Sequence, residues 1–225
     1  EYELTDNVDA YVDVLISNNE SFGRYAPPAA PGPVIPGDPR NTVGATNGYF
    51  RWTDIGTRDN VVNDDLINID LGLRGDLSDE MSWEVYATLS EYRSVSVGRS
   101  YLSYAGLEYN IAYDIDDFDT FVANLKATTL DDNKQKMTKF FGGLQWDLFD
   151  MAGGQASTYF AMEYYEVDYA ALVDAQSEAG LIGGSAGNSA QGYRDITAFS
   201  VEAIFPVTDW LEIDAAVRYD DYSDF

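Results

Sequence analysis

The chain contains no cysteine and no histidine among its 225 residues. Disulfide frameworks, thiolate chemistry, Cys/His zinc sites and the nucleophile systems that pair serine or cysteine with histidine are therefore excluded. Basic residues are scarce, because 13 lysines and arginines stand against 39 acidic residues and the formal net charge is −26. Such a charge argues against nucleic acid and anionic membrane surfaces as partners, since both call for basic patches.

Long hydrophobic runs are absent as well. No stretch approaches the roughly 18 consecutive apolar residues that a membrane-spanning helix needs. Residues 1–10 lack the basic and apolar regions of a signal peptide, so we expect a mature or internal piece if the protein is exported. The chain is nevertheless 45% hydrophobic and 14% aromatic, which is too rich for a disordered chain. We therefore expect a folded protein.

The dominant pattern is an alternation of apolar and polar residues, which is typical of strands with two different faces. Near the end of the sequence, Leu211, Ile213 and Val217 alternate with Glu212 and Asp214. Seven stretches follow this pattern, at residues 6–17, 66–76, 82–92, 140–149, 156–166, 195–205 and 210–219. The sequence therefore predicts an all-β fold with about seven antiparallel strands.

The connections between these stretches fall into two classes. Three are tight, at about 76–82, 150–155 and 206–209, and three are long, at about 18–61, 94–137 and 169–192. Short turns at one end and long loops at the other are typical of an outer-membrane barrel, with periplasmic turns and extracellular loops. Strands of about 10 residues, tilted by about 45°, would also match the apolar band of that membrane. Only residues 116–129 show a helical period, inside a long loop.

Aromatic residues sit where such a barrel would need them. Trp83, Trp146 and Trp210 lie beside the three tight turns, and an indole suits a membrane–water boundary because its ring is buried while its N–H stays wet. At the opposite boundary we expect Tyr92, Tyr164 and Tyr219. The alternative is a soluble β-sandwich in which these rings form the core. The loop layout and the placement of the aromatic residues favour the barrel over this alternative. We therefore expect the apolar faces to meet lipid and the acidic, tyrosine-rich faces to line a water-filled lumen.

Four stretches resemble bacterial TonB-dependent outer-membrane receptors. "LEIDAAVRYDDYSDF" (211–225) resembles their barrel signature, and "DLGLRGDLSDEMSWEVYATLSEY" (70–92) is similar to a strand–turn–strand of the family. "GGLQWDLFDMAGGQASTYFAMEYYE" (142–166) and "GYRDITAFSVEAIFPVTDWLEI" (192–213) resemble the following hairpins. The resemblance covers most of residues 60–225, and residues 1–25 are compatible with a preceding barrel strand.

The resemblance implies an antiparallel up-and-down transmembrane β-barrel of about 22 strands filled by a plug domain. It implies an outer-membrane location and active uptake of a ferric siderophore, cobalamin or an oligosaccharide, driven through the TonB–ExbB–ExbD complex. Its partners would be its own plug domain, that complex, lipopolysaccharide or other lipid, and the ligand. Seven strands cannot close such a barrel. Residues 1–225 are therefore expected to be one part of the barrel domain, without the plug domain and the C-terminal strands.

Candidate site residues lie on the polar faces of the predicted strands. We expect these side chains to line the lumen and to contact the plug or a ligand: Tyr11, Asp13, Asp70, Arg74, Glu84, Tyr86, Glu163, Tyr165, Glu202, Asp214 and Arg218. No cofactor is expected. The acidic run at 114–119 has the carboxylate density for Ca²⁺ but fails the EF-hand spacing. Its candidate ligands are Asp114, Asp116, Asp117 and Asp119.

Other functions stay open at this point. A carboxylate pair of the glycosidase type is formally available, but no acidic residue is singled out by an apolar pocket, so we expect no enzyme. A soluble, calcium-dependent carbohydrate-binding β-sandwich would explain the acidity and the aromatic residues. A passive porin would explain a barrel without a plug. The layout of the turns and the resemblance favour the receptor.

Overall fold

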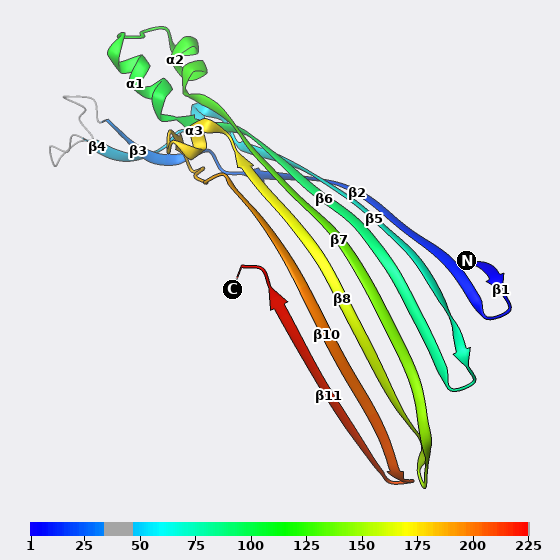
Figure 1. Ribbon diagram of the computed structural model, residues 1–225. Helices are drawn as coiled ribbons and strands as arrows, with labels where there is room; N and C mark the ends of the chain where they lie inside the picture. The colour runs from blue at the N-terminus through cyan, green and yellow to red at the C-terminus, as the bar shows by residue number, and fades with distance from the viewer. Residues whose placement is uncertain (34–46, 225) are drawn as a thin grey trace.

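The computed structural model describes residues 1–33 and 47–224. Its main sheet is one curved antiparallel layer in which the strands follow each other in chain order (Figure 1). The strands on this path are β1 (Tyr2–Thr5), β2 (Val8–Tyr25), β5 (Arg58–Ser78), β6 (Met81–Ser103), β7 (Lys126–Met151), β8 (Gly154–Val173), β10 (Ala190–Thr208) and β11 (Leu211–Tyr222). The seven predicted strands correspond to β2, β5, β6, β7, β8, β10 and β11. The predicted up-and-down antiparallel order is confirmed.

The remaining elements gather at one end of this sheet (Figure 1). They are β3 (Ala29–Pro33), β4 (Asn47–Arg51), η1 (Thr53–Ile55), α1 (Tyr104–Ala112), α2 (Phe118–Leu125), α3 (Ala175–Glu178) and β9 (Ile182–Gly183). Strands β3 and β4 form a separate hairpin, and β9 pairs with β6. Residues 34–46 of the predicted loop 18–61 lie outside the described residues. No described helix is long and apolar enough to cross a membrane.

Helix α2 confirms the helical period within residues 116–129, whereas α1 was not predicted. Both helices begin at a capping side chain, which is the local reason that they start where they do. The Asp117 carboxylate accepts a hydrogen bond from the Thr120 backbone N–H at 2.9 Å. The Ser103 hydroxyl accepts one from the Gly106 N–H at 3.0 Å.

The strands are much longer than the predicted length of about 10 residues. Strands β5 to β8 contain 20 to 26 residues, so they extend far beyond an apolar band of about 25 Å. Much of each predicted long loop is therefore strand, as in the pairing of residues 59–66 with 92–99. The prediction was wrong here because charged residues such as Glu91 and Arg93 interrupt the alternation of apolar and polar positions, while the backbone ladder continues without it.

Two-residue turns occupy the opposite end of the sheet. They lie at residues 6–7, 79–80, 152–153 and 209–210, and the first of them was not predicted. Backbone hydrogen bonds link neighbouring turns: the Asp76 N–H donates to the Asn7 carbonyl at 3.1 Å, and the Asp147 N–H donates to the Glu80 carbonyl at 2.8 Å. The hairpins are thus tied to each other along the rim formed by the turns.

Among the described residues, no second layer covers the apolar face of the sheet. Ile16 is 71% exposed and Val217 is 66% exposed, although both belong to the alternating apolar positions. The largest buried cluster lies instead at the helical end, where Ala30, Ile55, Leu102, Leu107 and Leu125 pack together. Exposed apolar side chains over a whole sheet face are unusual for a protein in water. Such an arrangement is typical of a barrel wall whose apolar face meets lipid.

One of the aromatic residues expected at a membrane boundary lies on the polar face. Strand register places Trp83, Trp146, Tyr164 and Tyr219 on the apolar face, as expected for residues at a membrane boundary. Tyr92 lies on the opposite face, where its hydroxyl donates a hydrogen bond to the Asp64 carboxylate at 2.9 Å. The reason is the period of two, because Tyr92 stands an even number of residues after Glu84 and therefore shares its face.

Candidate functional site

The strand register brings the predicted site residues to one face of the sheet. Residues directly opposite each other in neighbouring antiparallel strands share a face. Tyr11 is opposite Gly72, Gly72 opposite Tyr86, Tyr86 opposite Phe141, and Phe141 opposite Glu163. Alternation along each strand places all the predicted residues on this polar face: Tyr11, Asp13, Asp70, Arg74, Glu84, Tyr86, Glu163, Tyr165, Glu202, Asp214 and Arg218. Whether this face lines a lumen stays a prediction.

Tyr11 lies flat across the neighbouring strand. A Cβ atom on Gly72 would come within 2.2 Å of Cζ of Tyr11, so no other residue at that position leaves room for the ring. The Tyr11 hydroxyl donates a hydrogen bond to Oε1 of Glu84 at 2.8 Å, one strand further on. The ring therefore bridges β2 and β6 across β5, and the missing side chain of Gly72 makes that bridge feasible.

Arg74 is the basic residue of this corner of the polar face. Its guanidinium lies 5.7 Å from the centroid of the Tyr11 ring and forms an ion pair with Glu1 at 2.5 Å. Arg74, Tyr11, Glu84 and Asp70 help to line an open hollow of about 520 Å³. The hollow offers carboxylates, hydroxyls, one guanidinium and the Lys139 ammonium to whatever covers this face.

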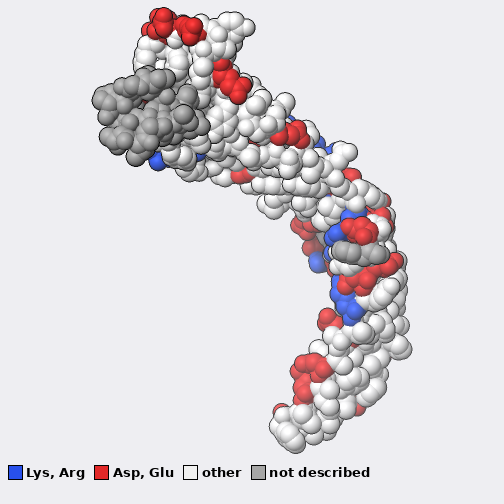
Figure 2. Space-filling model, turned by 90° about the vertical axis from the view of Figure 1, so that its left-hand side faces the viewer, with Lys and Arg blue, Asp and Glu red and all other residues white. Residues whose placement is uncertain are grey.

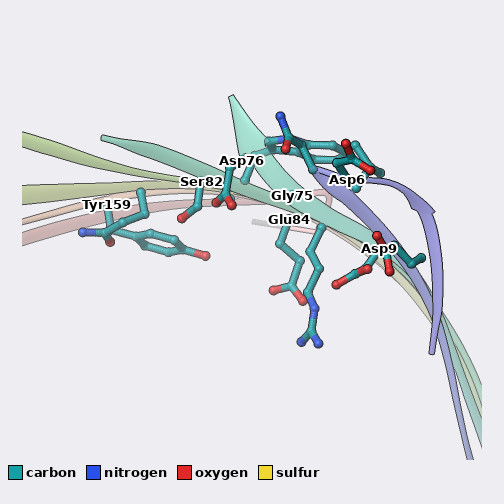
Figure 3. A pocket seen from close by; sticks show the side chains of 14 residues that line it. Asp6, Asp9, Gly75, Asp76, Ser82, Glu84 and Tyr159 are labelled. Carbon is teal, nitrogen blue, oxygen red and sulfur yellow. The ribbon is translucent and has the colours of Figure 1, made fainter. Parts of the chain in front are cut away.

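A second hollow of about 630 Å³ lies closer to the turns (Figure 3). Acidic side chains come to it from the turn between β1 and β2 and from β2, β5 and β6, and Tyr159 closes its far side. Its labelled side chains are Asp6, Asp9, Asp76, Ser82, Glu84 and Tyr159. The two hollows share Arg74 and Glu84, so that pair of residues separates them. Of the two hollows, the one at the turn end of the polar face is therefore the more acidic.

An ion-pair network crosses the other half of the polar face. Glu163 accepts from the Lys139 ammonium at 2.6 Å and from the Arg218 guanidinium at 2.6 Å. Arg218 reaches Glu163 across β10, where Ala198 is fully buried and leaves the path open. Arg218 also forms an ion pair with Asp220 at 3.0 Å. The network links β7, β8 and β11, and the exposed fraction of the Glu163 side chain is only 14%.

Aromatic rings pack beside this network. Tyr86 and Phe141 stack with ring centroids 4.6 Å apart, and the Lys139 ammonium lies 5.6 Å from each centroid. Lys139 thus interacts with Glu163 on one side and with two ring faces on the other.

On the side of the molecule shown in Figure 2, acidic side chains lie along its whole length, and basic ones gather beside them near mid-length.

Some predicted residues share the face without joining a network. Within residues 1–33 and 47–224, Asp13, Glu202 and Asp214 form no ion pair, although register places them on the polar face. Tyr165 lies opposite Lys139 on the same face. Their carboxylates and ring are open to the space above the sheet, where the family resemblance places a plug.

The candidate calcium residues lie at the helical end. Asp117 caps α2 through the Thr120 N–H, and Asp114 has a left-handed backbone with φ of 46°. Among the described residues, no three acidic side chains are grouped closely enough to hold a metal ion. A calcium ion held by Asp114, Asp116, Asp117 and Asp119 stays a prediction that would require additional ligands or a rearranged loop.

Sequence reasoning missed Lys139 and the role of the glycines beneath the tyrosine rings of the polar face. Lys139 stands just before the predicted stretch 140–149, and only its pairing with Glu163 gives it a role. Tyr159 lies over Gly143, whose added Cβ would come within 2.2 Å of the tyrosine hydroxyl, as Tyr11 lies over Gly72. Glycines at polar positions inside alternating strands were the available signal, because such glycines mark close approach of another group.

The family comparison decides the identity of this sheet. The model of the family described as "TonB dependent receptor-like, beta-barrel" matches residues 2–225. The chain belongs to this family. No curated protein and no solved structure matches the chain.

Membership in the TonB-dependent receptor family accounts for both faces of the sheet. The strands are part of a larger outer-membrane-type barrel, which confirms the predicted fold class. The family is one of transport barrels and not of enzymes. In a barrel of this kind the apolar face of a wall strand is expected on the outside and the polar face on the inside.

Proposed function

We propose that the full receptor takes up a scarce ligand across the bacterial outer membrane by TonB-dependent active transport. The observation that carries the proposal is the two-faced sheet: an uncovered apolar face backs a polar face with an ion-pair network and two open hollows. The family match over residues 2–225 supports the same conclusion. The ligand is a ferric siderophore, cobalamin or an oligosaccharide.

In this proposal the polar face serves as the inner wall and holds the plug domain. Tyr11, Glu84 and Arg74 offer hydrogen bonds and a cation on one side, and Glu163 with Lys139 offers a closed network on the other. A closed ion-pair network stiffens the wall, whereas side chains without ion pairs, such as Asp13 and Asp214, are free to contact a plug or a ligand. Energy would come from the TonB–ExbB–ExbD complex acting on the plug.

Uptake in cells tests the proposal. We would delete the gene for the full receptor and measure the uptake of radiolabelled ferric siderophores, cobalamin and maltose- or xylose-based oligosaccharides, with and without TonB. We expect one ligand class to lose uptake in the receptor deletion and equally in the TonB deletion. Uptake that continues unchanged without TonB would contradict active transport and support a passive porin. Recovery of the protein in the soluble fraction would support the carbohydrate-binding β-sandwich instead.

A further inference from the structure

Arg58 differs from the other basic residues of the polar face. It is the first residue of β5 and stands an even number of residues before Asp70, so it lies on the polar face at the helical end of the sheet. Within residues 1–33 and 47–224 it forms no ion pair, although the whole chain has 39 acidic residues. The basic residues of this face that do pair with a carboxylate are Arg74, Lys139, Arg194 and Arg218.

Two tyrosine rings hold the Arg58 guanidinium in place. Its central carbon lies 5.5 Å from the ring centroid of Tyr101 and 6.0 Å from that of Tyr25. Nε donates a hydrogen bond to the Ala26 carbonyl at 3.0 Å. Among the described residues this is the one hydrogen bond of the guanidinium. The four N–H groups on Nη1 and Nη2 are therefore available to an acceptor from outside the sheet.

A β-bulge in β6 brings Tyr101 to this face. The pairs on either side of the bulge are Gly98 with Thr129 and Tyr101 with Ala127, so β6 has two intervening residues where β7 has one. One of the two, Ser100, has a left-handed backbone with φ of 60°, which is uncommon for a residue other than glycine. Without the extra residue, the odd-numbered Tyr101 would lie on the apolar face. The bulge thus supplies the second ring beside the guanidinium.

The Tyr101 ring is fixed by its neighbours. A Cβ on Gly98 would come within 2.6 Å of Cε2 of Tyr101, so the ring lies over a glycine. The Tyr101 hydroxyl donates a hydrogen bond to Oδ1 of Asn60 at 3.2 Å. Tyr101 is 7% exposed, whereas Tyr25 is 53% exposed. The guanidinium therefore has a rigid aromatic wall on one side and an accessible ring on the other.

A glycine lies beside the outer edge of the guanidinium. Gly184 directly follows β9, which pairs with the end of β6. Its φ is 88°, and an added Cβ would lie 3.0 Å from Nη1 of Arg58. A larger side chain there would occupy the space that an acceptor of the Nη1 hydrogens needs. The glycine keeps that edge of the guanidinium accessible.

The strands around Arg58 carry few carboxylates on the polar face. Along β5 toward the turns, the first one on this face is Asp64, six residues away, which is about 20 Å at about 3.3 Å per residue. On β2 the same face is uncharged from Tyr25 to Ser17, and on β6 it is uncharged from Gly98 to Tyr86. Charges about 20 Å apart are largely screened at physiological salt. The carboxylates of these strands therefore repel an anion at Arg58 only weakly, despite the net charge of −26.

We propose that Arg58 binds a carboxylate of the transported ligand, and that the ligand is an anionic ferric siderophore and not an uncharged oligosaccharide. The planar fork of an arginine matches the two oxygens of a carboxylate. Here the fork is Nη1 and Nη2, and the exposed ring of Tyr25 flanks the bound group. The proposal rests on the proposed function, because it names which of the three ligand classes this receptor takes up.

The test measures the binding of succinate to the purified full-length receptor in detergent by saturation-transfer NMR. Succinamide is the uncharged probe of the same shape. The test variant is Arg58→Gln, and the control is Arg99→Gln, which removes an arginine opposite Asp59 on the other face of the same strand pair. We expect Arg58→Gln to bind succinate about tenfold more weakly, as for the loss of a hydrogen bond between charged groups. The control should bind like the wild type, and succinamide should bind no receptor measurably.

A second pair of variants keeps the arginine and changes only the space beside it. Gly184→Ala places a Cβ against Nη1 and should weaken succinate binding. Gly180→Ala is its matched control, because Gly180 also has a positive φ, of 71°, and nothing lies within 4 Å of its added Cβ. Both variants carry the same kind of backbone strain, so a difference between them reports on the space at Arg58. Equal succinate binding by the two would contradict the proposal.

Thermal unfolding of Arg58→Gln separates binding from a purely structural role. A lower melting temperature with unchanged succinate binding would mean that Arg58 only joins the two tyrosine rings, and the proposal would be overturned. Absence of succinate binding to the wild type would overturn it as well. Inorganic phosphate is the last probe, because the phosphodiester of cobalamin would use the same fork. Tighter binding of phosphate than of succinate would contradict the carboxylate assignment.

This proposal and the proposed function fail separately. Succinate binding is measured on the purified receptor, and uptake is measured in cells. TonB-dependent uptake of an oligosaccharide would overturn the carboxylate proposal and leave active transport standing. Uptake that is independent of TonB would contradict active transport without changing the succinate result.

Discussion

At the scale of single residues, the polar face depends on glycines that make room for tyrosine rings. Gly72 accommodates Tyr11, and Gly143 accommodates Tyr159, in strands that are otherwise lined with larger side chains. A ring lying flat over a glycine shields the backbone of that strand and brings the hydroxyl to a neighbouring strand, as in the bond from Tyr11 to Glu84. The value of these glycines lies in the absence of a side chain and not in an unusual backbone conformation.

Gly72→Ala tests this role. The new Cβ would come within 2.2 Å of Tyr11, so the ring must move and its bond to Glu84 is lost. We expect the free energy of unfolding to fall by about 1–3 kcal/mol, the usual cost of overpacking. Urea unfolding of the full receptor, followed by tryptophan fluorescence, measures the change.

Gly192→Ala is the matched control, because nothing lies within 4 Å of a Cβ at that position of β10. It should leave the unfolding free energy nearly unchanged. The double variant Tyr11→Ala/Gly72→Ala should lose less than the sum of its single changes, since the small side chain removes the clash. Additive losses would show that the ring and the glycine act independently.

Glu163 is the second residue whose removal should matter. Glu163→Gln removes the charge that Lys139 and Arg218 share, and the Lys139 side chain is only 23% exposed. Leaving that ammonium without its carboxylate should cost about 1–3 kcal/mol of unfolding free energy. Asp220→Asn, which affects the more exposed partner of Arg218, should cost less than about 1 kcal/mol. Thermal unfolding of both variants, measured side by side, would contradict this account if Asp220→Asn were the more damaging change.

At the scale of elements, the sequence predicted the hairpins near the turns better than the helical end. Alternation in stretches such as 82–92 identified the strands and their faces, because Trp83, Val85, Ala87 and Leu89 keep one face apolar over most of the stretch. Beyond Leu89 the charged residues Glu91 and Arg93 interrupt that face, so the alternation that resumes at Val95 and Val97 in the continuation of β6 to Ser103 was missed. Helix α1 was missed for a related reason, since its residues show little separation of apolar and polar sides. Its position depends on tertiary packing of Leu107 against Leu102 and Leu125.

The candidate site, like the strands and helices, was predictable from the sequence only in part. The period of two was sufficient to place every predicted polar residue on one face, including Glu163 and Arg218. Their contact was not predictable, because β10 separates their strands and only the register shows that Ala198 lies between them. Register depends on the whole ladder and on the bulges beside each turn, such as the shift between Asp76 and Ser78.

The cap of α3 gives a pH dependence at the helical end. The Asp174 carboxylate accepts hydrogen bonds from the backbone N–H groups of Gln176, Ser177 and Leu130 at 3.0–3.2 Å. Burial opposes its ionisation, but these bonds lower the pKa of Asp174 below its ordinary value of 3.8. Burial and the neighbouring Asp174 raise the pKa of Asp131. The two groups therefore affect stability with opposite signs.

The stability of this region should pass through a maximum as the pH falls from 7. Protonation of Asp131 comes first and removes its repulsion with Asp174, which stabilises the folded loop. Protonation of Asp174, below pH 3.8, then removes the cap and destabilises it. Hydrogen exchange at Gln176 and Ser177 in the full receptor measures both effects. Asp131→Asn should raise protection at pH 7 and abolish the first phase, and protection that falls steadily from pH 7 would contradict the assignment.

At the scale of the whole molecule, the account rests on which phase meets each face of the sheet. The apolar face carries exposed side chains over β2 to β11 and is covered by no other described element, while the polar face holds the network of Glu163 and the two hollows. In a soluble protein, the apolar face would have to be buried and the polar face would have to be exposed to water. A receptor barrel in the outer membrane reverses the usual arrangement, with lipid outside and a polar interior.

Substitutions on the two faces of one strand distinguish a soluble protein from a membrane barrel. In β11, Val217→Lys puts a charge on the apolar face, and Ala216→Lys puts the same charge on the polar face beside it. We expect Val217→Lys to make folding into lipid vesicles less favourable by about 2–4 kcal/mol, as for lysine near the middle of a bilayer. Ala216→Lys should cost much less. Equal costs at the two positions would mean that the faces are not in different phases.

The most direct measurement scans β11 with nitroxide spin labels in the full receptor reconstituted in lipid bilayers. Residues 1–225 contain no cysteine, so single cysteines can be introduced one at a time at positions 211–219. The account predicts that labels at odd positions collide mainly with oxygen dissolved in lipid, and that labels at even positions collide more with a water-soluble nickel complex or are shielded by the plug. Odd positions that are shielded from both reagents would place them in a protein core, and the barrel account would then be wrong.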